Sequence, residues 1–404
     1  MTIDRRSFLQ FCSALPFVAP RDFVTWVPGG DDRVLLVLEL VGGNDGLNTV
    51  IPVDDARYAA LRPRLSVVRA GAHTLDDGTA LHPALARLHR GVRDGRGAVV
   101  HGVGHDTPDR SHFRSRDIWH SADPTLPRVE ARTTGWLGRA ADRLAAAAGA
   151  GVPSAAIGGL EVPLVLRGEH VTAPSLRRVE DFQWLSTAAG PFGATSPTRE
   201  LVAGGTARDG DDVRAFAAST ARAAVDLAGR LEQALGRYRP HADYPTTALA
   251  RDLQLAARLC VAGFGTRVLH VAFGGFDTHA RQLPTHAGLL ATLDGALDAF
   301  LQDLDAHGHG DRLAVLVHSE FGRRAAENAS HGTDHGAAAP VFAFGPVRGG
   351  THGTLPDLTR LGDGDVVATT DFRSVYADLL SWLGVEPSDV LGAAFAPVGL
   401  FADR

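Results

Sequence analysis

Residues 34–41 read VLLVLELV, and Gly42 and Gly43 follow directly. A short, nearly unbroken apolar run that ends at glycines is typical of a strand buried on both faces of a sheet. Comparable runs are GAVVHGV at 97–103, RVLHVAF at 267–273, RLAVLVH at 312–318 and the stretch 340–344. Over 290–304, leucine and phenylalanine recur with the spacing of a helix face. This alternation predicts an α/β fold, a three-layer sandwich with a largely parallel central sheet.

The domain organisation follows from where this pattern weakens. Residues 31–404 carry the pattern and are expected to form a single domain. Over 151–211 the sequence turns to Gly, Pro, Ser and Thr, with two short strand-like pieces near Ala156 and Val165. That composition indicates a cap or insertion rather than a separate domain. Residues 1–30 are expected to be an export leader and linker.

The leader carries Arg5 and Arg6, then Phe8 and Leu9, then a mildly apolar run over 11–19. A paired arginine before such a run looks like a twin-arginine export signal, and the run is too short to span a bilayer. We therefore expect the twin-arginine export machinery as a partner, a periplasmic or extracellular location, and no transmembrane span in the mature chain. The alternative is a basic terminus without a targeting role.

Composition and charge exclude several classes of protein. Among 404 residues, 45% are hydrophobic and 21% are charged, a balance typical of globular proteins. All 40 basic residues are arginine, which excludes pyridoxal enzymes, P-loop NTPases and ordinary kinases, because each needs a lysine. A formal net charge of −6 argues against a general nucleic-acid binder, and 18 histidines favour metal or acid–base chemistry.

Two polar clusters follow the first two predicted strands, where ligands bind in open α/β sheets. Asp45, in GGNDG at 42–46, either points at a cation or bonds to its own turn. Ser111, in DRSHFR at 109–114, is expected at the start of a helix, either as its N-cap or as a nucleophile that a metal ion activates. Arg110 is a candidate anion clamp at the positive end of that helix.

A third cluster, GGFDTH at 274–279, contains Asp277 and His279. Residues two apart in an extended segment face the same way, so these two side chains can converge on one ion. A carboxylate with an imidazole suits zinc or manganese best among divalent metal ions, and calcium or magnesium remain alternatives.

The fourth cluster combines HSEFGRR at 318–324 with GTDHG at 332–336. Glu320 is a candidate metal ligand, and Arg323 is a candidate anion clamp. Asp334 or His335 could complete the metal site while the other supports it from behind. Asp371, in TDFRSVY at 370–376, is expected to be a helix N-cap.

Together, these motifs resemble the exported bacterial family of domain of unknown function 1501. The resemblance extends from the paired arginines to Leu400 and Phe401. The family is placed in the alkaline phosphatase-like superfamily, which includes sulfatases, so the resemblance implies a central α/β sheet and a bimetallic site. The superfamily pattern then makes Asp45 a metal ligand and Ser111 the nucleophile. Ser111 is followed by His-Phe-Arg rather than by x-P-x-R, so a formylglycine sulfatase is not expected.

The same resemblance assigns the remaining ligands in two ways. Asp277 with His279 resembles the superfamily's Asp–His pair. Asp334-His335 matches its Asp-His dipeptide by composition. By topology, Glu320 takes the place of the dipeptide and His335 resembles the final histidine, and this second version is preferred. It leaves the second metal short of a nitrogen ligand.

These observations predict a metal-dependent hydrolase of phosphoric or sulfuric esters, with a small-molecule or glycan ester as substrate. In this hypothesis Ser111 attacks the ester, while Arg110 or Arg323 holds its free oxygens. One alternative is a non-catalytic exported binding or assembly protein that retains the fold. Another is a single-metal phosphodiesterase or lyase with His112 or His105 as its base.

Overall fold

The fold is that of a computed structural model, which describes residues 32–130, 133–148, 153–159, 161–171, 173–177, 236–263 and 265–402. The predicted export leader at 1–30 lies outside these residues, as does most of the predicted cap at 151–211. In the described part of that cap, two short strands belong to the central sheet. The piece near Val165, expected to be strand-like, is a 3₁₀ turn instead.

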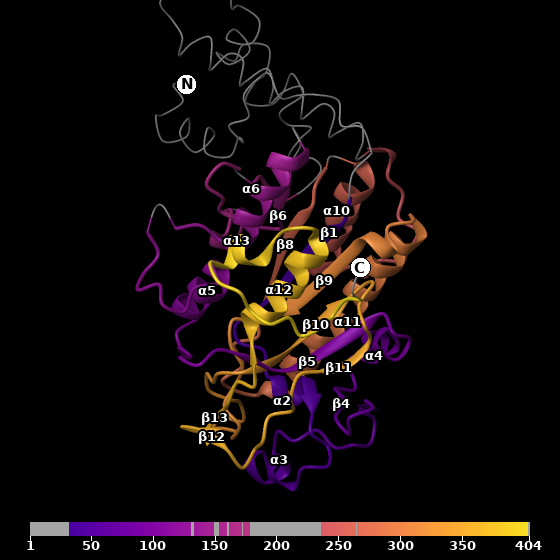
Figure 1. The fold of residues 1–404 in the computed structure, drawn as a ribbon. Coiled ribbons are helices and arrows are strands. Elements are labelled where there is room, and N and C mark those ends of the chain that lie inside the picture. Colours follow the sequence, from indigo (N-terminus) through magenta and orange to yellow (C-terminus); the bar gives the residue numbers. More distant parts are fainter. Residues whose placement is uncertain are drawn as a thin grey trace, which may run out of the picture.

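Within the described ranges the central sheet has nine strands, including all five predicted from the apolar runs. In spatial order they are β11 (Gly350–His352), β5 (Gly97–Gly104), β10 (Ala339–Phe344), β9 (Leu313–His318), β1 (Val34–Val41), β8 (Val268–Gly274), β6 (Ser154–Ile157) and β7 (Ser175–Leu176), with β14 (Thr370–Asp371) paired to β5. Strand β10 runs antiparallel to β5 and β9, whereas the other pairings are parallel. The predicted largely parallel sheet is therefore confirmed (Figure 1).

Helices cover both faces of this sheet, which confirms the predicted three layers. The side chains of Leu36 and Leu38 pack in one core cluster and those of Leu35 and Val37 in another, because successive side chains of a strand point to opposite faces. The first core is shared with α4 (Ala86–Arg93), α10 (Ala248–Ala262) and α11 (Gln282–Ala306). The second is shared with α5 (His112–Ser121), α6 (Trp136–Ala148), α12 (Phe372–Leu383) and α13 (Pro387–Leu391).

Shorter elements extend the loops at one end of the sheet (Figure 1). They are α2 (Gly46–Thr49), α3 (Ala56–Leu61), β2 (Val50–Ile51), β3 (His73–Thr74), β4 (Ala80–Leu81), β12 (Leu361–Gly362) and β13 (Asp365–Val366). Two 3₁₀ turns, η1 (Leu164–Leu166) and η2 (Gly310–Arg312), complete the described elements. No helix within the described residues is both long and apolar enough to cross a membrane.

The direction of the strands brings the polar clusters together. Strands β1, β5, β8 and β9 run the same way, so the loops after them emerge at one edge of the sheet. The predicted site residues follow these four strands in the sequence. Parallel pairing therefore brings segments more than 200 residues apart in the chain to the same edge.

Candidate metal centre

His112 is the first residue of α5 and reaches across to the end of β9. Its Nδ1 lies 2.8 Å from Glu320 Oε1. A carboxylate oxygen accepts in this contact, so Nδ1 carries the hydrogen and Nε2 is the nitrogen left to bind a metal ion. Nε2 is shielded from solvent without a hydrogen-bond partner, and it lies 3.5 Å from Asp277 Oδ2. A buried nitrogen lone pair that faces a carboxylate indicates a place for a cation.

Two more imidazoles face Asp277 in the same manner. His335 Nε2 and His279 Nε2 lie 3.1 and 3.0 Å from Asp277 Oδ1, and 2.9 Å from each other. His335 Nδ1 donates to the carbonyl oxygen of Arg110 at 2.7 Å, and His279 Nδ1 donates to Asp334 Oδ1 at 3.2 Å. Because both partners are acceptors, each Nδ1 carries a hydrogen, and Nε2 is the nitrogen left to bind a metal ion. A metal ion among these Nε2 atoms and Asp277, or a proton on one of the rings, removes the repulsion between lone pairs at such short contacts.

Part of the geometry of this group matches the ligand spacing of a tetrahedral transition-metal site. Ligand atoms of His112, Asp277 and His335 all lie within 4.8 Å of one another, and His279 adjoins two of them. Ligands about 2.0–2.1 Å from a tetrahedral zinc ion are separated by about 3.3 Å, which the contacts of 2.9–3.5 Å approximate. Three imidazole nitrogens with one carboxylate favour zinc over the oxygen-seeking calcium and magnesium ions.

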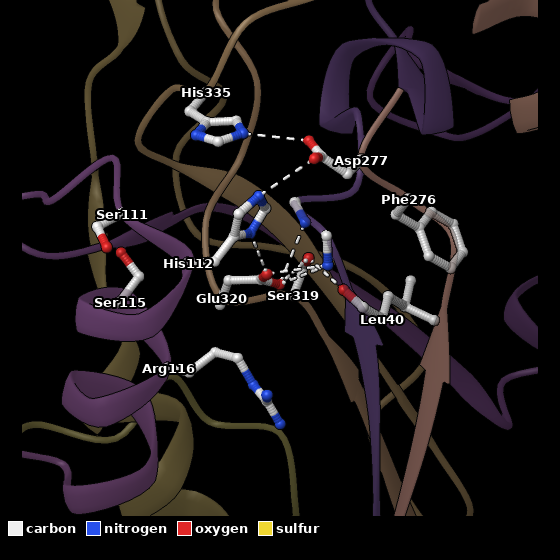
Figure 2. A network of polar contacts seen from close by, with 12 residues as sticks. Leu40, Ser111, His112, Ser115, Arg116, Phe276, Asp277, Ser319, Glu320 and His335 are labelled. Carbon is white, nitrogen blue, oxygen red and sulfur yellow. Dashed lines mark hydrogen bonds and ion pairs between the residues drawn. The ribbon is translucent and has the colours of Figure 1, made fainter. Parts of the chain in front are cut away.

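Glu320, predicted as a metal ligand, lies behind His112 in the structure. Its fully buried carboxylate accepts hydrogen bonds from the backbone of Gly42 at 2.9 Å, the backbone of Gly43 at 3.1 Å and Ser319 Oγ at 3.0 Å. Figure 2 shows the carboxylate of Glu320 below the imidazole of His112, with Ser319 beside it. With His112 as a further donor, Glu320 orients that imidazole and fixes its tautomer.

Arg323, predicted as an anion clamp, donates its hydrogen bonds to acceptors within the protein. Its fully buried guanidinium donates to carbonyl oxygens of Gly42, Gly43, Phe276 and Thr333, and to Asp277 Oδ1 at 2.6 Å. Partial burial raises the pKa of Asp277, but the hydrogen bond and the positive charge of Arg323 outweigh this and lower the pKa. Arg323 therefore joins the loops after β1, β8 and β9, and keeps Asp277 ionised.

Asp45, also predicted as a ligand, takes part in a separate buried ion pair. Both of its carboxylate oxygens lie 2.7 Å from Nη1 of Arg62, and neither side chain is exposed to solvent. Asp45 also accepts from the side chain of Gln282 and caps α2 through the backbone of Asn48 at 3.2 Å. Its oxygens are thus occupied by donors, and the structure does not bring it into contact with the three histidines.

Two further predicted residues, Asp334 and Arg110, contact other side chains of the protein. Asp334 holds His279 from behind, the supporting role foreseen for one member of its pair. Arg110 pairs through its guanidinium with Asp363 at 2.9 Å and Asp365 at 2.8 Å.

Ser111 caps α5, with its exposed Oγ 3.5 Å from the backbone nitrogen of Arg114. Figure 2 shows it apart from the imidazole of His112. The N-cap interpretation of Ser111 is therefore the one for which the structure shows a contact. Asp371 likewise caps α12, as expected.

The sequence indicated His112 as a catalytic residue and not as a candidate metal ligand, and it pointed to neither Arg62 nor Glu39. A signal existed for Glu39, which is the single charged residue in the apolar run of β1. Nothing near Arg62 in the sequence identifies Asp45 as its partner, since 17 residues separate them.

Comparisons with known proteins give little guidance on activity. No curated protein matches the sequence. Among solved structures, the chain is similar to the lipoteichoic acid synthase LtaP from Listeria monocytogenes (TM-score 0.41, 10% identity, covering 92% of this chain and 79% of that one). It is also similar to the PsFucS1 sulfatase from Pseudoalteromonas sp. (TM-score 0.36, 12% identity, 92% and 71%). A third is the C-terminal periplasmic domain of EcEptC from Escherichia coli in a complex with Zn (TM-score 0.38, 8% identity, 78% and 74%).

At such TM-scores and identities these similarities carry no functional argument, so the side chains of this chain must supply it. The sequence family is a different matter, because its match extends over nearly the whole described fold. The chain matches the family described as "Protein of unknown function (DUF1501)" over residues 32–396 and belongs to it, which confirms the family resemblance seen in the sequence motifs.

Proposed function

We propose that this chain is a metal-dependent hydrolase of phosphoric or sulfuric esters that acts after export from the cytoplasm. The observation that carries the proposal is the convergence of three imidazole Nε2 atoms, of His112, His279 and His335, on the carboxylate of Asp277. When bound there, a divalent ion supplies a Lewis acid that stabilises the negative charge developing on the ester.

The charge of the centre favours an anionic substrate. Three neutral imidazoles and one carboxylate leave a divalent ion with about one uncompensated positive charge. Helix α5 begins at His112, so the positive end of its dipole adds to this field. Phosphoric and sulfuric esters of small molecules or glycans carry the matching negative charge.

The chain's own residues keep the ligands in place. Glu320 and Asp334 hold two imidazoles by their Nδ1 atoms, and Arg323 holds Asp277. The ring of Phe321 packs 4.9 Å from the ring of His112 and 4.8 Å from that of His335. This apolar side chain keeps water from the buried side of the centre, which strengthens its electrostatic interactions.

A binding protein without catalysis is the second candidate. This candidate is favoured because both arginines predicted to hold the substrate are engaged within the protein. The guanidinium of Arg323 is buried among protein acceptors, and that of Arg110 is paired with carboxylates. Such a protein would bind a metal ion and an anion without turning over an ester.

The test compares the wild-type protein with His112→Ala and Ser111→Ala. We expect wild type to hold at least one tight equivalent of transition metal and to hydrolyse aryl phosphates or aryl sulfates. His112→Ala should lose both properties. Ser111→Ala should keep both and lose only about 1 kcal/mol of stability as a helix cap. Loss of turnover with retained metal in Ser111→Ala would restore serine as the nucleophile.

Removal of the metal ion with a chelator is a second test of the same proposal. Treatment with a chelator should abolish turnover, and zinc or manganese should restore it. Wild-type protein with no tight metal and no turnover contradicts the proposal, whereas tight metal without turnover selects the binding protein. Export is tested by replacing Arg5 and Arg6 with lysine, which should leave the protein in the cytoplasmic fraction.

A further inference from the structure

Glu39 lies in the middle of the protein and is held as an anion. Its side chain is fully buried in β1, with Oε1 2.8 Å from Nε of Arg116. Oε2 lies 3.1 Å from Nε2 of His120 and 3.2 Å from Nε2 of His270. A buried carboxylate is tolerated only with such partners, since the uncompensated charge would cost several kcal/mol. Arg116 neutralises Glu39, so the cluster needs no metal ion of its own.

Two of these partners belong to the helix that carries His112. His112, Arg116 and His120 are spaced by four residues and therefore lie on one face of α5. His112 contacts Glu320 at the end of β9, while Arg116 and His120 contact Glu39 deeper in the sheet. Figure 2 shows Arg116 on the side of α5 that faces the strands, below His112. The two buried carboxylates thus hold opposite ends of the same helix face.

The position of His112 is sensitive to small movements of α5. A side-chain tip lies about 5–6 Å from a helix axis, so a rotation of about 10° moves it by about 1 Å. Metal coordination tolerates a change of only about 0.2 Å in ligand distance. The fourth member of the cluster, His270, lies on β8, which backbone ladders to β1 and β6 hold on both sides. Glu39 therefore restrains α5 more than it restrains β8.

We propose that Glu39 is a positioning residue of the metal centre, which orients α5 through Arg116 and His120 so that His112 can bind a divalent transition-metal ion. The inference rests on the proposed function, because it assumes that His112, Asp277, His279 and His335 bind that ion.

His120→Leu and His270→Leu form the deciding pair of variants. Each removes one donor to the same oxygen of Glu39, from a side chain that is at most 6% exposed. Only His120 lies on α5. We expect His120→Leu to weaken zinc binding about tenfold, measured by competition with a chromogenic chelator, and His270→Leu to leave it close to wild type. The visible spectrum of the cobalt-substituted protein should change only in His120→Leu.

A second pair covers the case in which one of these variants does not fold. Glu39→Gln removes the central charge, whereas Asp303→Asn removes another fully buried carboxylate, which bonds to the hydroxyl of Tyr244 at 2.9 Å and the backbone of His241 at 2.7 Å. Both variants should lose stability. Glu39→Gln should also weaken zinc binding about tenfold, whereas Asp303→Asn should not.

The outcomes distinguish this inference from the proposed function. Wild type that binds no zinc overturns both. Wild type that binds zinc, together with equal affinities for His120→Leu and His270→Leu, overturns the positioning role alone. Two zinc equivalents in wild type, one of them lost in Glu39→Gln, would place an ion on Glu39 itself and would also overturn it.

Discussion

Asp45→Asn separates the two roles open to this carboxylate, metal ligand or ion-pair partner. The pair that Asp45 forms with Arg62 is wholly buried, with both oxygens 2.7 Å from one guanidinium nitrogen. Asparagine has nearly the same shape and caps a helix as well as aspartate does, so α2 keeps its N-cap. The substitution therefore keeps the helix cap, removes the negative charge beside a buried cation, and turns an acceptor that faces Arg62 and Gln282 into a donor.

The expected cost follows from the guanidinium that is left behind. Arg62 keeps its hydrogen bonds to the carbonyl oxygens of Arg324 and Ala325, but its positive charge no longer has a carboxylate beside it. Breaking a buried ion pair from one side costs about 3–5 kcal/mol, a large part of a total stability of about 5–15 kcal/mol. We expect the free energy of unfolding of Asp45→Asn to fall by that amount.

Urea denaturation with zinc present, and again with chelator present, measures this loss. The double variant Asp45→Asn with Arg62→Met removes the orphaned charge and should recover most of the lost stability. Zinc stoichiometry should be unchanged in both variants, because Asp45 contacts neither Asp277 nor any of the three histidines around it. If Asp45→Asn lost its zinc but kept its stability, Asp45 would be the ligand that the sequence suggested, and the reasoning from the buried ion pair would fail.

Two further predictions concern pH and backbone. Burial lowers the pKa of His286 from 6.5 to about 4. On acidification the unfolded chain therefore takes up this proton first, and the contribution of His286 to the free energy of unfolding falls by about 3 kcal/mol between pH 6.5 and 4. In His286→Gln the free energy of unfolding should fall less over this pH range, and equal slopes for the two proteins would contradict the assignment. Gly42→Ala should weaken zinc binding, since the φ of Gly42 is +118° and a Cβ there would lie 2.4 Å from the backbone nitrogen of Asp277. The control, Gly71→Ala, has a φ of +91° and open space around it, so it should lose only about 1–3 kcal/mol of stability through backbone strain. Equal zinc affinity in the two variants would refute the steric argument.

Much of the fold could be predicted from local patterns. The apolar run in β1 and its four counterparts predicted strands because each is short, continuous and bounded by glycine or polar residues. The caps at Ser111 and Asp371 were predictable because a helix end needs an acceptor from its nearest neighbours. The antiparallel direction of β10 was not predictable, since no local feature of an apolar strand reports its direction.

For the candidate site, too, only part of the arrangement could be predicted from the sequence. That polar loops after β1, β5, β8 and β9 would meet at one edge followed from the sequence, because parallel strands end together. The sequence alone therefore determined the sheet, the family and the set of loops around the candidate centre.

Only the tertiary structure decided the partner of each charged group. Glu320 meets the backbone of Gly42 across 278 positions of sequence, and Arg323 meets Asp277 across 46. Asp45 and Glu320 are surrounded by donors from arginine, amide or hydroxyl groups, whereas Asp277 accepts from Arg323 and also faces the imidazole nitrogens. Those neighbours are set by the packing of distant segments, which residue type and spacing do not record.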